Sequence, residues 1–277
     1  MKNIDQLAYW IKEREKVRIL KEKGVAKPWS KDWVFQTVYF CNVHREDDKV
    51  TKWIREEWES VHHEKYEFAM CLARLLNWPA SLEAIGPPWK NGWSVGTAID
   101  TLNARAEEGH KIWGNAYVVT THGQKISKLE YLENVLTRLW EAPLHNDMQN
   151  IGKLSMAHVY LMQYEGFASF MAAQVIADLK NSEGHPLQYA SDWWNWSAPG
   201  PGSLRGLAWV WHGPHSKVSP LQYHDMMKEL HPAIEELVHP IHMCEQDLQN
   251  CLCEFDKYMR VKHRTGRSKR RYNGGKG

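Results

Sequence analysis

The residues most able to do chemistry stand together at Arg45, Glu46, Asp47 and Asp48, directly before a predicted helix, with Lys52 one turn further on as a candidate phosphate ligand. Adjacent carboxylates beside an arginine can have shifted pKa values, so that one group orients an incoming amine or water and another holds a phosphate. Asp47 with Asp48 could also hold a divalent metal ion beside a phosphate. Capping is the alternative, because negative charge is favoured at a helix N-terminus.

A second candidate for phosphate binding is the stretch Asp192 to Leu207, in which glycines and prolines surround Ser203 and Arg205. Glycines such as Gly202 permit close approach of the backbone, and arginine matches phosphate oxygens with two parallel hydrogen bonds. We therefore predict an exposed, ordered loop over residues 197–206 that brings amides and a guanidinium to a phosphate. A rigid connector is the alternative.

The stretch Tyr164 to Leu179 predicts a helix-hairpin-helix element, because it follows a helical segment and places Gly166 at a tight turn. The helix after this turn is predicted to bury Met171, Val175 and Ile176. Its first backbone amides could face a DNA phosphate. An ordinary packing corner between two helices explains the same pattern.

Four further residues are weaker candidates. Asn115 and Tyr117 are polar groups among apolar neighbours and could read a base edge, whereas a tyrosine in the core is the common alternative. Glu254 and Lys257 lie near the C-terminus, where local salt bridging is a sufficient explanation. Residues 257–277 carry nine lysines and arginines, Arg270 among them, and no acid, which predicts a basic tail that binds a polyanion or is simply solvated.

Helical periodicity dominates the elements that must position these residues. Helices are predicted over residues 3–23, 47–60, 63–76, 128–140 and 155–179, whereas residues 116–121 are the best strand candidate and residues 87–96 predict a loop. The fold class is therefore mainly α. We expect one helical catalytic unit over residues 1–256, with one core or two lobes, followed by the basic tail.

Composition excludes several classes of protein. The 277 residues are 43% hydrophobic with a net charge of +2, which indicates a globular protein and not a polycation. Five scattered cysteines do not predict a disulfide framework. Without a signal peptide or an apolar stretch of about 20 residues, we expect a cytoplasmic protein with no membrane partner.

The GxxxxGK[ST], GxGxxG, HExxH and GxSxG motifs are missing, so kinase, dehydrogenase, zinc protease and hydrolase functions lack support.

Taken in order, REDD at 45–48, GNAY at 114–117, YEGFASFMAAQVIADL, PGPGSLRG at 199–206 and QNCLCEFDKY at 249–258 resemble the phage alpha-glutamyl/putrescinyl thymine pyrophosphorylase family of amino acid:DNA transferases. The resemblance runs from about Tyr9 to Tyr272. It implies a bilobal helical fold related to helix-hairpin-helix DNA glycosylases, in the host cytoplasm of a phage. It also implies candidate site residues, namely Arg45, Glu46, Asp47, Asp48, Asn115, Tyr117, Arg205 and Glu254.

In such pathways a separate kinase phosphorylates 5-hydroxymethyluracil in DNA, and the family then exchanges the phosphate or pyrophosphate for an amine. The implied partners are double-stranded DNA carrying the modified thymine and an amino acid or polyamine, and no cofactor is required. Under this hypothesis Arg45 and Arg205 bind the departing phosphate, the three acids after Arg45 take the proton of the amine, and Tyr117 or Trp194 stacks on a flipped base. The alternatives are a glycosylase-like base-excision enzyme and a non-catalytic DNA-binding partner of the kinase.

Overall fold

The computed structural model describes residues 1–116, 119–121, 123–214 and 216–266, and nearly all of its regular structure is helical. The prediction of a mainly α fold is confirmed. At the best strand candidate the described residues, Ala116 and residues 119–121, have no regular structure. The five predicted helical segments are present, and the last of them is divided by a hairpin turn.

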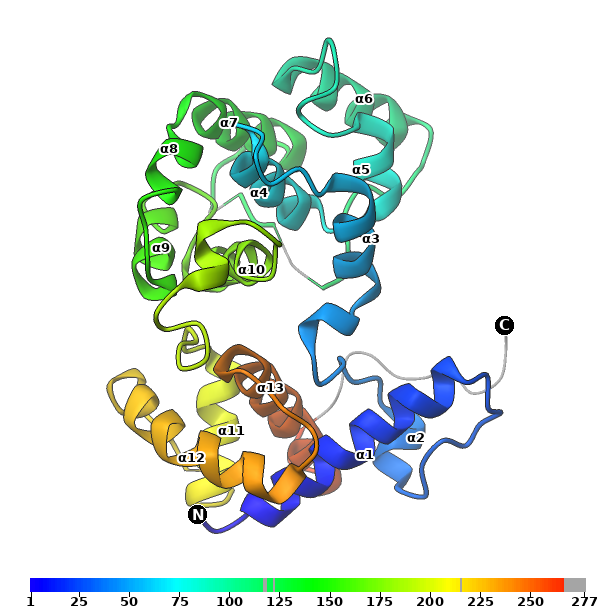
Figure 1. The fold of residues 1–277 in the computed structure, drawn as a ribbon. Helices are drawn as coiled ribbons and strands as arrows, with labels where there is room; N and C mark the ends of the chain where they lie inside the picture. Colours follow the sequence, from blue (N-terminus) through cyan, green and yellow to red (C-terminus); the bar gives the residue numbers. More distant parts are fainter. Residues whose placement is uncertain (117–118, 122, 215, 267–277) are drawn as a thin grey trace. The chain divides into compact units, whose positions relative to one another are not determined.

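The chain divides into two compact units, of which the first combines residues 1–48 with residues 194–277 and the second comprises residues 49–193. Figure 1 labels the helices of both. The first unit contains α1 (Ile4–Glu22), α2 (Trp33–Thr37), α11 (Pro201–Trp211), α12 (Tyr223–Val238) and α13 (Glu245–Lys262), with short 3-10 turns η1 (Arg45–Asp47) and η3 (Pro220–Gln222). The second contains α3 (Lys49–Trp58), α4 (Tyr66–Leu76), α5 (Pro79–Ile85), α6 (Val95–Glu107), α7 (Lys128–Glu141), α8 (Leu144–Met148), α9 (Leu154–Leu161), α10 (Ser169–Leu179) and η2 (Pro186–Tyr189).

Helix α13 forms the centre of the first unit and packs against α1, α2, α11 and α12. Its contact with α11 is the closest, because two glycines of α11 replace side chains there. A Cβ atom on Gly202 would lie 2.9 Å from Cys253 Sγ, and one on Gly206 would lie 2.8 Å from the carbonyl carbon of Leu252. The loop predicted over residues 197–206 is therefore wrong from Pro201 onward. That proline begins a helix, where its fixed φ fits and its missing N–H costs nothing.

Helix α4 forms the centre of the second unit, and each of its eleven residues is buried. It packs against α5, α7, α8 and α10. Between α4 and α10 lies a solvent-excluded ion pair, in which Arg74 Nε donates to Asp178 Oδ2 at 2.5 Å with both side chains 1% exposed. Arg74 also donates to Thr51 Oγ1 and Asn77 Oδ1, so the buried charges are held by a hydrogen-bonded network.

The predicted helical hairpin is confirmed in the second unit, where α9 and α10 flank a tight turn. Gly166 has a φ of +88°, in the left-handed region that favours glycine, and Met171, Val175 and Ile176 are buried. Asp192 caps α9, since its carboxylate accepts hydrogen bonds from the amides of Leu154 and Ser155. The hairpin is thus fixed at its turn and at the start of its first helix.

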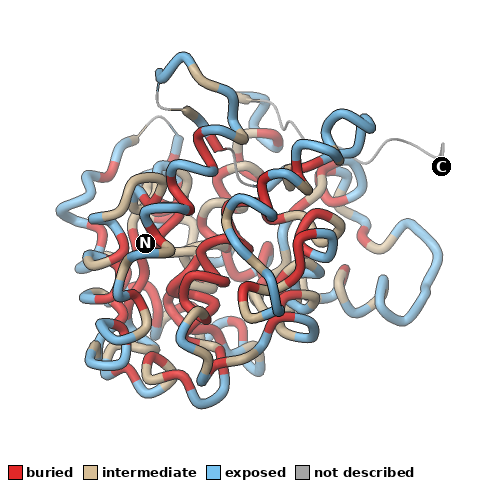
Figure 2. The backbone as a smooth tube through the Cα atoms, turned by 90° about the horizontal axis from the view of Figure 1, so that it is seen from above, coloured by how far each residue is buried: buried red, intermediate tan, exposed pale blue. Residues whose placement is uncertain are grey.

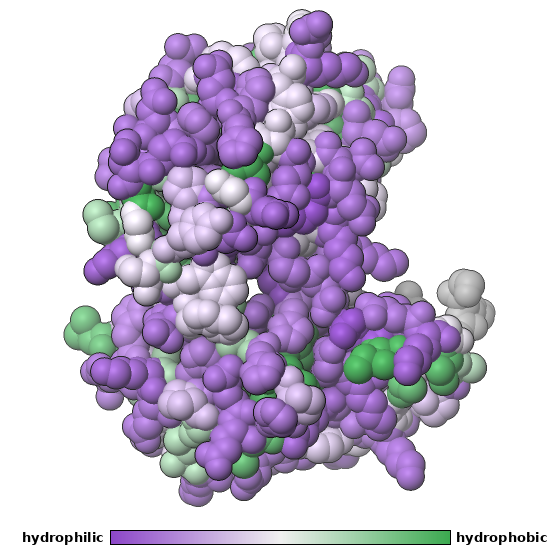
Figure 3. Space-filling view, viewed as in Figure 1, coloured by the Kyte–Doolittle hydropathy of each residue, from purple (hydrophilic) through white to green (hydrophobic). Residues whose placement is uncertain are grey.

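Buried residues occupy the inner faces of the helices in both units, and exposed residues the outer turns and loops (Figure 2). The face seen in Figure 3 is mainly hydrophilic, with small apolar areas. None of the helices in the described part of the chain has the length and apolar character needed to cross a bilayer.

Candidate functional site

Residues 39–48, the segment that carries the REDD motif, are held on one side by α1. Arg14 Nε donates to the carbonyl oxygen of Cys41 at 2.8 Å, and its Nη2 donates to Asn42 Oδ1. One turn later Arg18 Nε lies 3.1 Å from Asp47 Oδ2. Because Arg14 and Arg18 are four residues apart, both side chains leave the same face of the helix.

Helix α13 holds the other side of this segment through residues spaced three or four apart, which again share one face. Asp247 Oδ1 accepts from the Arg45 amide at 3.1 Å, Asn250 Nδ2 donates to the Asn42 carbonyl at 3.1 Å, Glu254 Oε2 accepts from the Cys41 amide at 2.9 Å, and Lys257 Nζ donates to the Tyr39 carbonyl at 3.1 Å. The irregular backbone of the segment is therefore satisfied by side chains instead of by a sheet or helix ladder. Two rigid helices position it.

The group in this segment best suited to proton transfer is His44. Its Nδ1 lies 3.6 Å from Asp247 Oδ2, and its side chain is 30% exposed. Asp247 raises the pKa of His44 above its usual value, against the opposing effect of burial. Burial would raise the pKa of Asp247, but His44 and the Arg45 amide outweigh it and lower that pKa. The carboxylate of Asp247 favours the charged form of the imidazole and orients its Nδ1, and a histidine of this kind can exchange a proton with a bound molecule.

The four REDD residues directly follow His44 in the sequence, and they differ in burial and in ion pairing. Arg45, Glu46 and Asp47 form the short turn η1, all three partly buried, and Asp48 after them is exposed. Asp47 is paired with Arg18, so its negative charge is already compensated. Among the three predicted acids, Asp47 is thus the least suited to accept a proton.

Arg205 and the PGPGSLRG segment do not join this group. Arg205 Nε donates to Asp256 Oδ2 at 2.9 Å, whereas Arg45 contacts Asp247, nine residues earlier on the same helix. At about 100° per residue these two aspartates point to opposite sides of α13. These contacts do not bring Arg45 and Arg205 together, and the hypothesis that both bind the same phosphate stays a prediction.

The exposed phosphate loop predicted around Ser203 is also not present. Ser203 is 0% exposed, and its hydroxyl hydrogen-bonds the backbone of Gly200, the residue that precedes α11. Gly202 lies against Cys253, so its role is to let two helices approach each other. The PGPGSLRG and QNCLCEFDKY motifs are thus the two sides of one helix interface, and the Arg205 side chain, 52% exposed, remains accessible.

Glu254 and Lys257, predicted to contact DNA or phosphate, are paired with each other at 2.7 Å, with side chains 12% and 18% exposed. Each also holds the backbone of the REDD segment, so both have structural roles. Because α13 continues to Lys262, the predicted start of the basic tail at residue 257 falls inside a helix. Arg270 lies outside the described residues.

The other predicted site residues belong to the second unit. Asn115 is exposed and Tyr117 lies outside the described residues. Gly114 before them permits a close contact with the Asn77 carbonyl, so the GNAY motif includes a packing residue. Lys52 is exposed on α3, and Gly166 shapes the hairpin turn.

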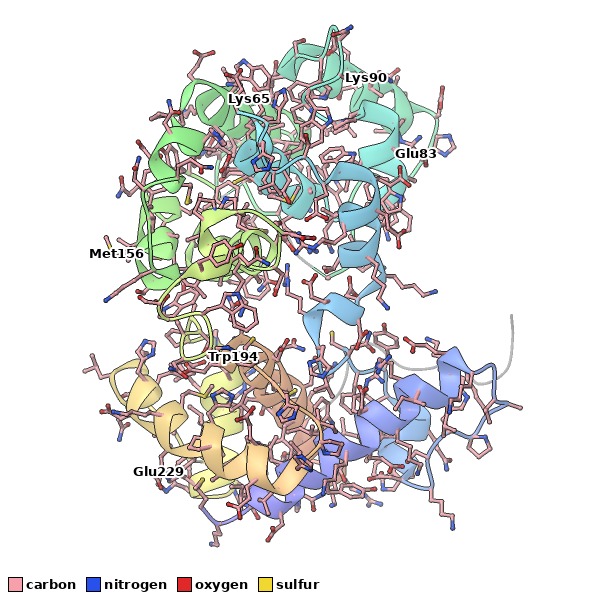
Figure 4. The ribbon with its side chains drawn as sticks, in the orientation of Figure 1. Lys65, Glu83, Lys90, Met156, Trp194 and Glu229 are labelled. Carbon is pink, nitrogen blue, oxygen red and sulfur yellow. The ribbon has the colours of Figure 1, made fainter. Side chains whose placement is uncertain are left out.

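The outer face of the hairpin is apolar where it meets solvent. Met156, Val159 and Met162 are 58%, 62% and 43% exposed, and Figure 4 shows Met156 projecting outward. In the turn, Glu165 forms an ion pair with Arg138. The hairpin therefore offers apolar side chains and a compensated acid, and its use in DNA binding stays a prediction.

Sequence reasoning missed His44 and its partner. His44 adjoins the REDD motif and could have been included from that position alone. Asp247 could not, because its contact with the segment joins residues 202 apart. A second missed group is Glu67, which is 0% exposed and lies 3.0 Å from His145 Nδ1 and 3.2 Å from His185 Nε2. In the described part of the chain, no three histidine, cysteine or acidic side chains are grouped as metal ligands.

These observations define a class: a helical protein of two units, one with two helices joined by a tight turn and the other with a histidine–aspartate pair beside an arginine. A family model described as "5-hmdU DNA kinase, helical domain" matches residues 1–268. The chain belongs to this family, which is related to thymidine hypermodification. The pyrophosphorylase family suggested by the motifs is not the one matched. Searches of curated proteins and of solved structures gave no match.

Proposed function

We propose that this protein replaces the phosphate or pyrophosphate on the C5 methylene of a 5-phosphomethyl-deoxyuridine in DNA with an amine, such as that of an amino acid or polyamine. The observation that carries the proposal is the family match over residues 1–268, a family related to thymidine hypermodification. The His44–Asp247 pair and Arg45 supply side chains suited to the reaction.

In the proposed reaction the C–O bond between the methylene and the phosphate breaks, assisted by electrons from the uracil ring. The bonding pair leaves with the phosphate. His44, whose pKa is raised by Asp247, protonates the departing oxygen, and Arg45 binds the phosphate. The amine loses a proton to Glu46 or Asp48, and its lone pair forms the new C–N bond. Both proton transfers fall to side chains, so the reaction as proposed requires no cofactor.

Mass spectrometry of nucleosides tests this function directly. Double-stranded DNA that contains 5-phosphomethyl-deoxyuridine is incubated with the protein and a mixture of amino acids and putrescine, then digested. We expect a nucleoside in which the phosphate is replaced by a C–N-linked amine. Unchanged substrate with every amine would refute the proposal, and alkali-labile abasic sites would indicate base excision instead.

Three variants test the assigned side chains. His44→Gln is expected to lower turnover about 10²- to 10⁴-fold, the usual contribution of one acid–base group. Asp247→Asn is expected to lower turnover less and to move the pH optimum down, because the pKa of His44 falls. His212→Gln, at an exposed histidine of the same unit, should have no effect. Wild-type rates in His44→Gln would remove this histidine from the mechanism.

The family description also suggests a competing function, because it names the helical domain of a kinase. A non-catalytic DNA-binding partner of such a kinase would bind the modified DNA and turn over none of the amines. A gel-shift measurement beside the mass spectrometry separates the two. Binding without turnover by the wild-type protein would favour the partner.

A further inference from the structure

The connection between α12 and α13 in the first unit carries two histidines, His239 and His242 (Figure 1). Both residues are exposed, and the centroids of their rings lie 5.8 Å apart. Within the part of the chain that the structure describes, neither imidazole forms a hydrogen bond or an ion pair, and neither has a ring contact with His44. The ring nitrogens of this pair are therefore accessible to a ligand from solvent.

Buried residues at both ends fix this connection. Val238, the last residue of α12, and Met243 are each 0% exposed. The Ile241 amide donates to the Val238 carbonyl at 3.1 Å, and the Met243 carbonyl accepts from His231 Nε2 of α12 at 2.6 Å. The two histidines therefore stand on a short anchored turn. Ligands that are already held near each other lose less entropy when an ion binds.

The separation of the two rings suits a single metal ion. Bonds from zinc to imidazole nitrogen are about 2.0–2.1 Å long, so two imidazoles on one tetrahedral ion have centroids about 5 Å apart. The observed separation of 5.8 Å exceeds this value by less than about 1 Å, and a small rotation of two exposed side chains can close the difference.

The charge around the pair also favours a cation. His239 directly follows α12, whose C-terminal end carries the negative part of the helix dipole. The last turn of α12 contains Glu235 and Glu236 and no basic residue. Imidazole is a preferred ligand of zinc, nickel and copper ions, whereas magnesium and calcium prefer oxygen ligands. The chemistry of the pair thus selects a transition metal.

We propose that His239 and His242 together bind one divalent transition-metal ion of the class that prefers imidazole, with water molecules completing its coordination. The described residues place no third histidine, cysteine or acid in a common metal-binding group with them. The site therefore has two protein ligands and open positions, unlike a closed structural zinc site. The inference concerns metal binding alone and does not depend on the transfer reaction.

The test is calorimetric titration of the full chain, without an affinity tag, with Zn²⁺, Ni²⁺ and Cu²⁺ in turn. We expect saturable binding, tightest for Cu²⁺. In NMR spectra, substoichiometric Cu²⁺ should broaden the imidazole signals of His239 and His242 first, and Mg²⁺ should leave those signals unchanged. Lack of binding by all three ions, or broadening that begins at other histidines, would overturn the proposal.

Variants locate the ion. His239→Gln and His242→Gln each remove one ligand and should each weaken Cu²⁺ binding at least about tenfold, since loss of a group that only orients a ligand already costs about 10- to 100-fold. His224→Gln, at an exposed histidine in the first turn of α12, is the matched control and should leave the affinity unchanged. If one variant does not fold, the other and the line broadening serve. Unchanged affinity with both histidines replaced would place the ion elsewhere.

Discussion

A single methyl group at Gly206 tests whether the PGPGSLRG motif is a helix interface or a phosphate loop. In Gly206→Ala the new Cβ would lie 2.8 Å from the carbonyl carbon of Leu252 and 2.9 Å from its Cβ. The carbonyl oxygen of Leu252 lies nearer still to this Cβ. Ordinary contacts begin at 3.4 Å, so α11 and α13 must separate by more than 0.6 Å at this point. The obstacle is backbone, which cannot rotate away as a side chain can.

The expected loss of stability follows from this geometry. Overpacking of a core contact costs about 1–3 kcal/mol. The better helix propensity of alanine offsets about 0.5–1 kcal/mol of this loss. We therefore expect Gly206→Ala to lower the free energy of unfolding by about 1–2 kcal/mol, measured by urea denaturation with tryptophan fluorescence. Gly96→Ala, in α6, is the control, because its Cβ would meet only Ser94 Oγ at 3.9 Å, and it should be neutral or slightly stabilising.

The opposite outcome is equally informative. If Gly206→Ala were as stable as the wild type but bound DNA more weakly, the motif would be acting through its exposed backbone. The assignment of Gly202 and Gly206 to helix packing would then be wrong. If Gly96→Ala lost as much stability as Gly206→Ala, the loss would reflect general intolerance of the helices and not the contact with Leu252.

Three other changes have outcomes that the structure predicts. Arg74→Met leaves the buried carboxylate on α10 without its cation and should cost about 3–5 kcal/mol, whereas Arg138→Met, at a side chain 67% exposed, should cost under about 1 kcal/mol in the same denaturation assay. The pKa of His44 is raised in the folded protein, so its contact with Asp247 stabilises the fold when the imidazole is charged. This contribution is fully present below the unfolded-state pKa of about 6.5, and it is lost as pH rises through the folded-state pKa. Asp247→Asn should therefore flatten the stability profile as pH rises above about 6.5 and lower the pKa of His44 measured by NMR. Asp192→Ala removes the cap of α9 and should cost about 1–2 kcal/mol, with faster hydrogen exchange of the first α9 amides, and unchanged exchange there would contradict the capping role.

The helices could be predicted from the sequence because their signals are local. The apolar residues of α1 repeat at three- and four-residue steps, and Gly166 marks a turn whose φ few other residues adopt. The class of the fold, the helical hairpin and the family context in thymidine hypermodification all follow from such patterns. The start of α11 was missed because glycine and proline punctuate loops more often than they begin helices.

What the sequence alone determined was which segments are helical and which motifs accompany one another along the chain. The tertiary structure decided which motifs are in contact. Helix α13 packs against PGPGSLRG on one face and contacts the REDD segment on the opposite face. Arg205 is thereby separated from Arg45, and His44 is joined to an aspartate near the other end of the chain. The physical reason is that helix periodicity and capping act within a few residues, whereas the pairing of buried charges and the close approach of helices depend on side chains far apart in sequence.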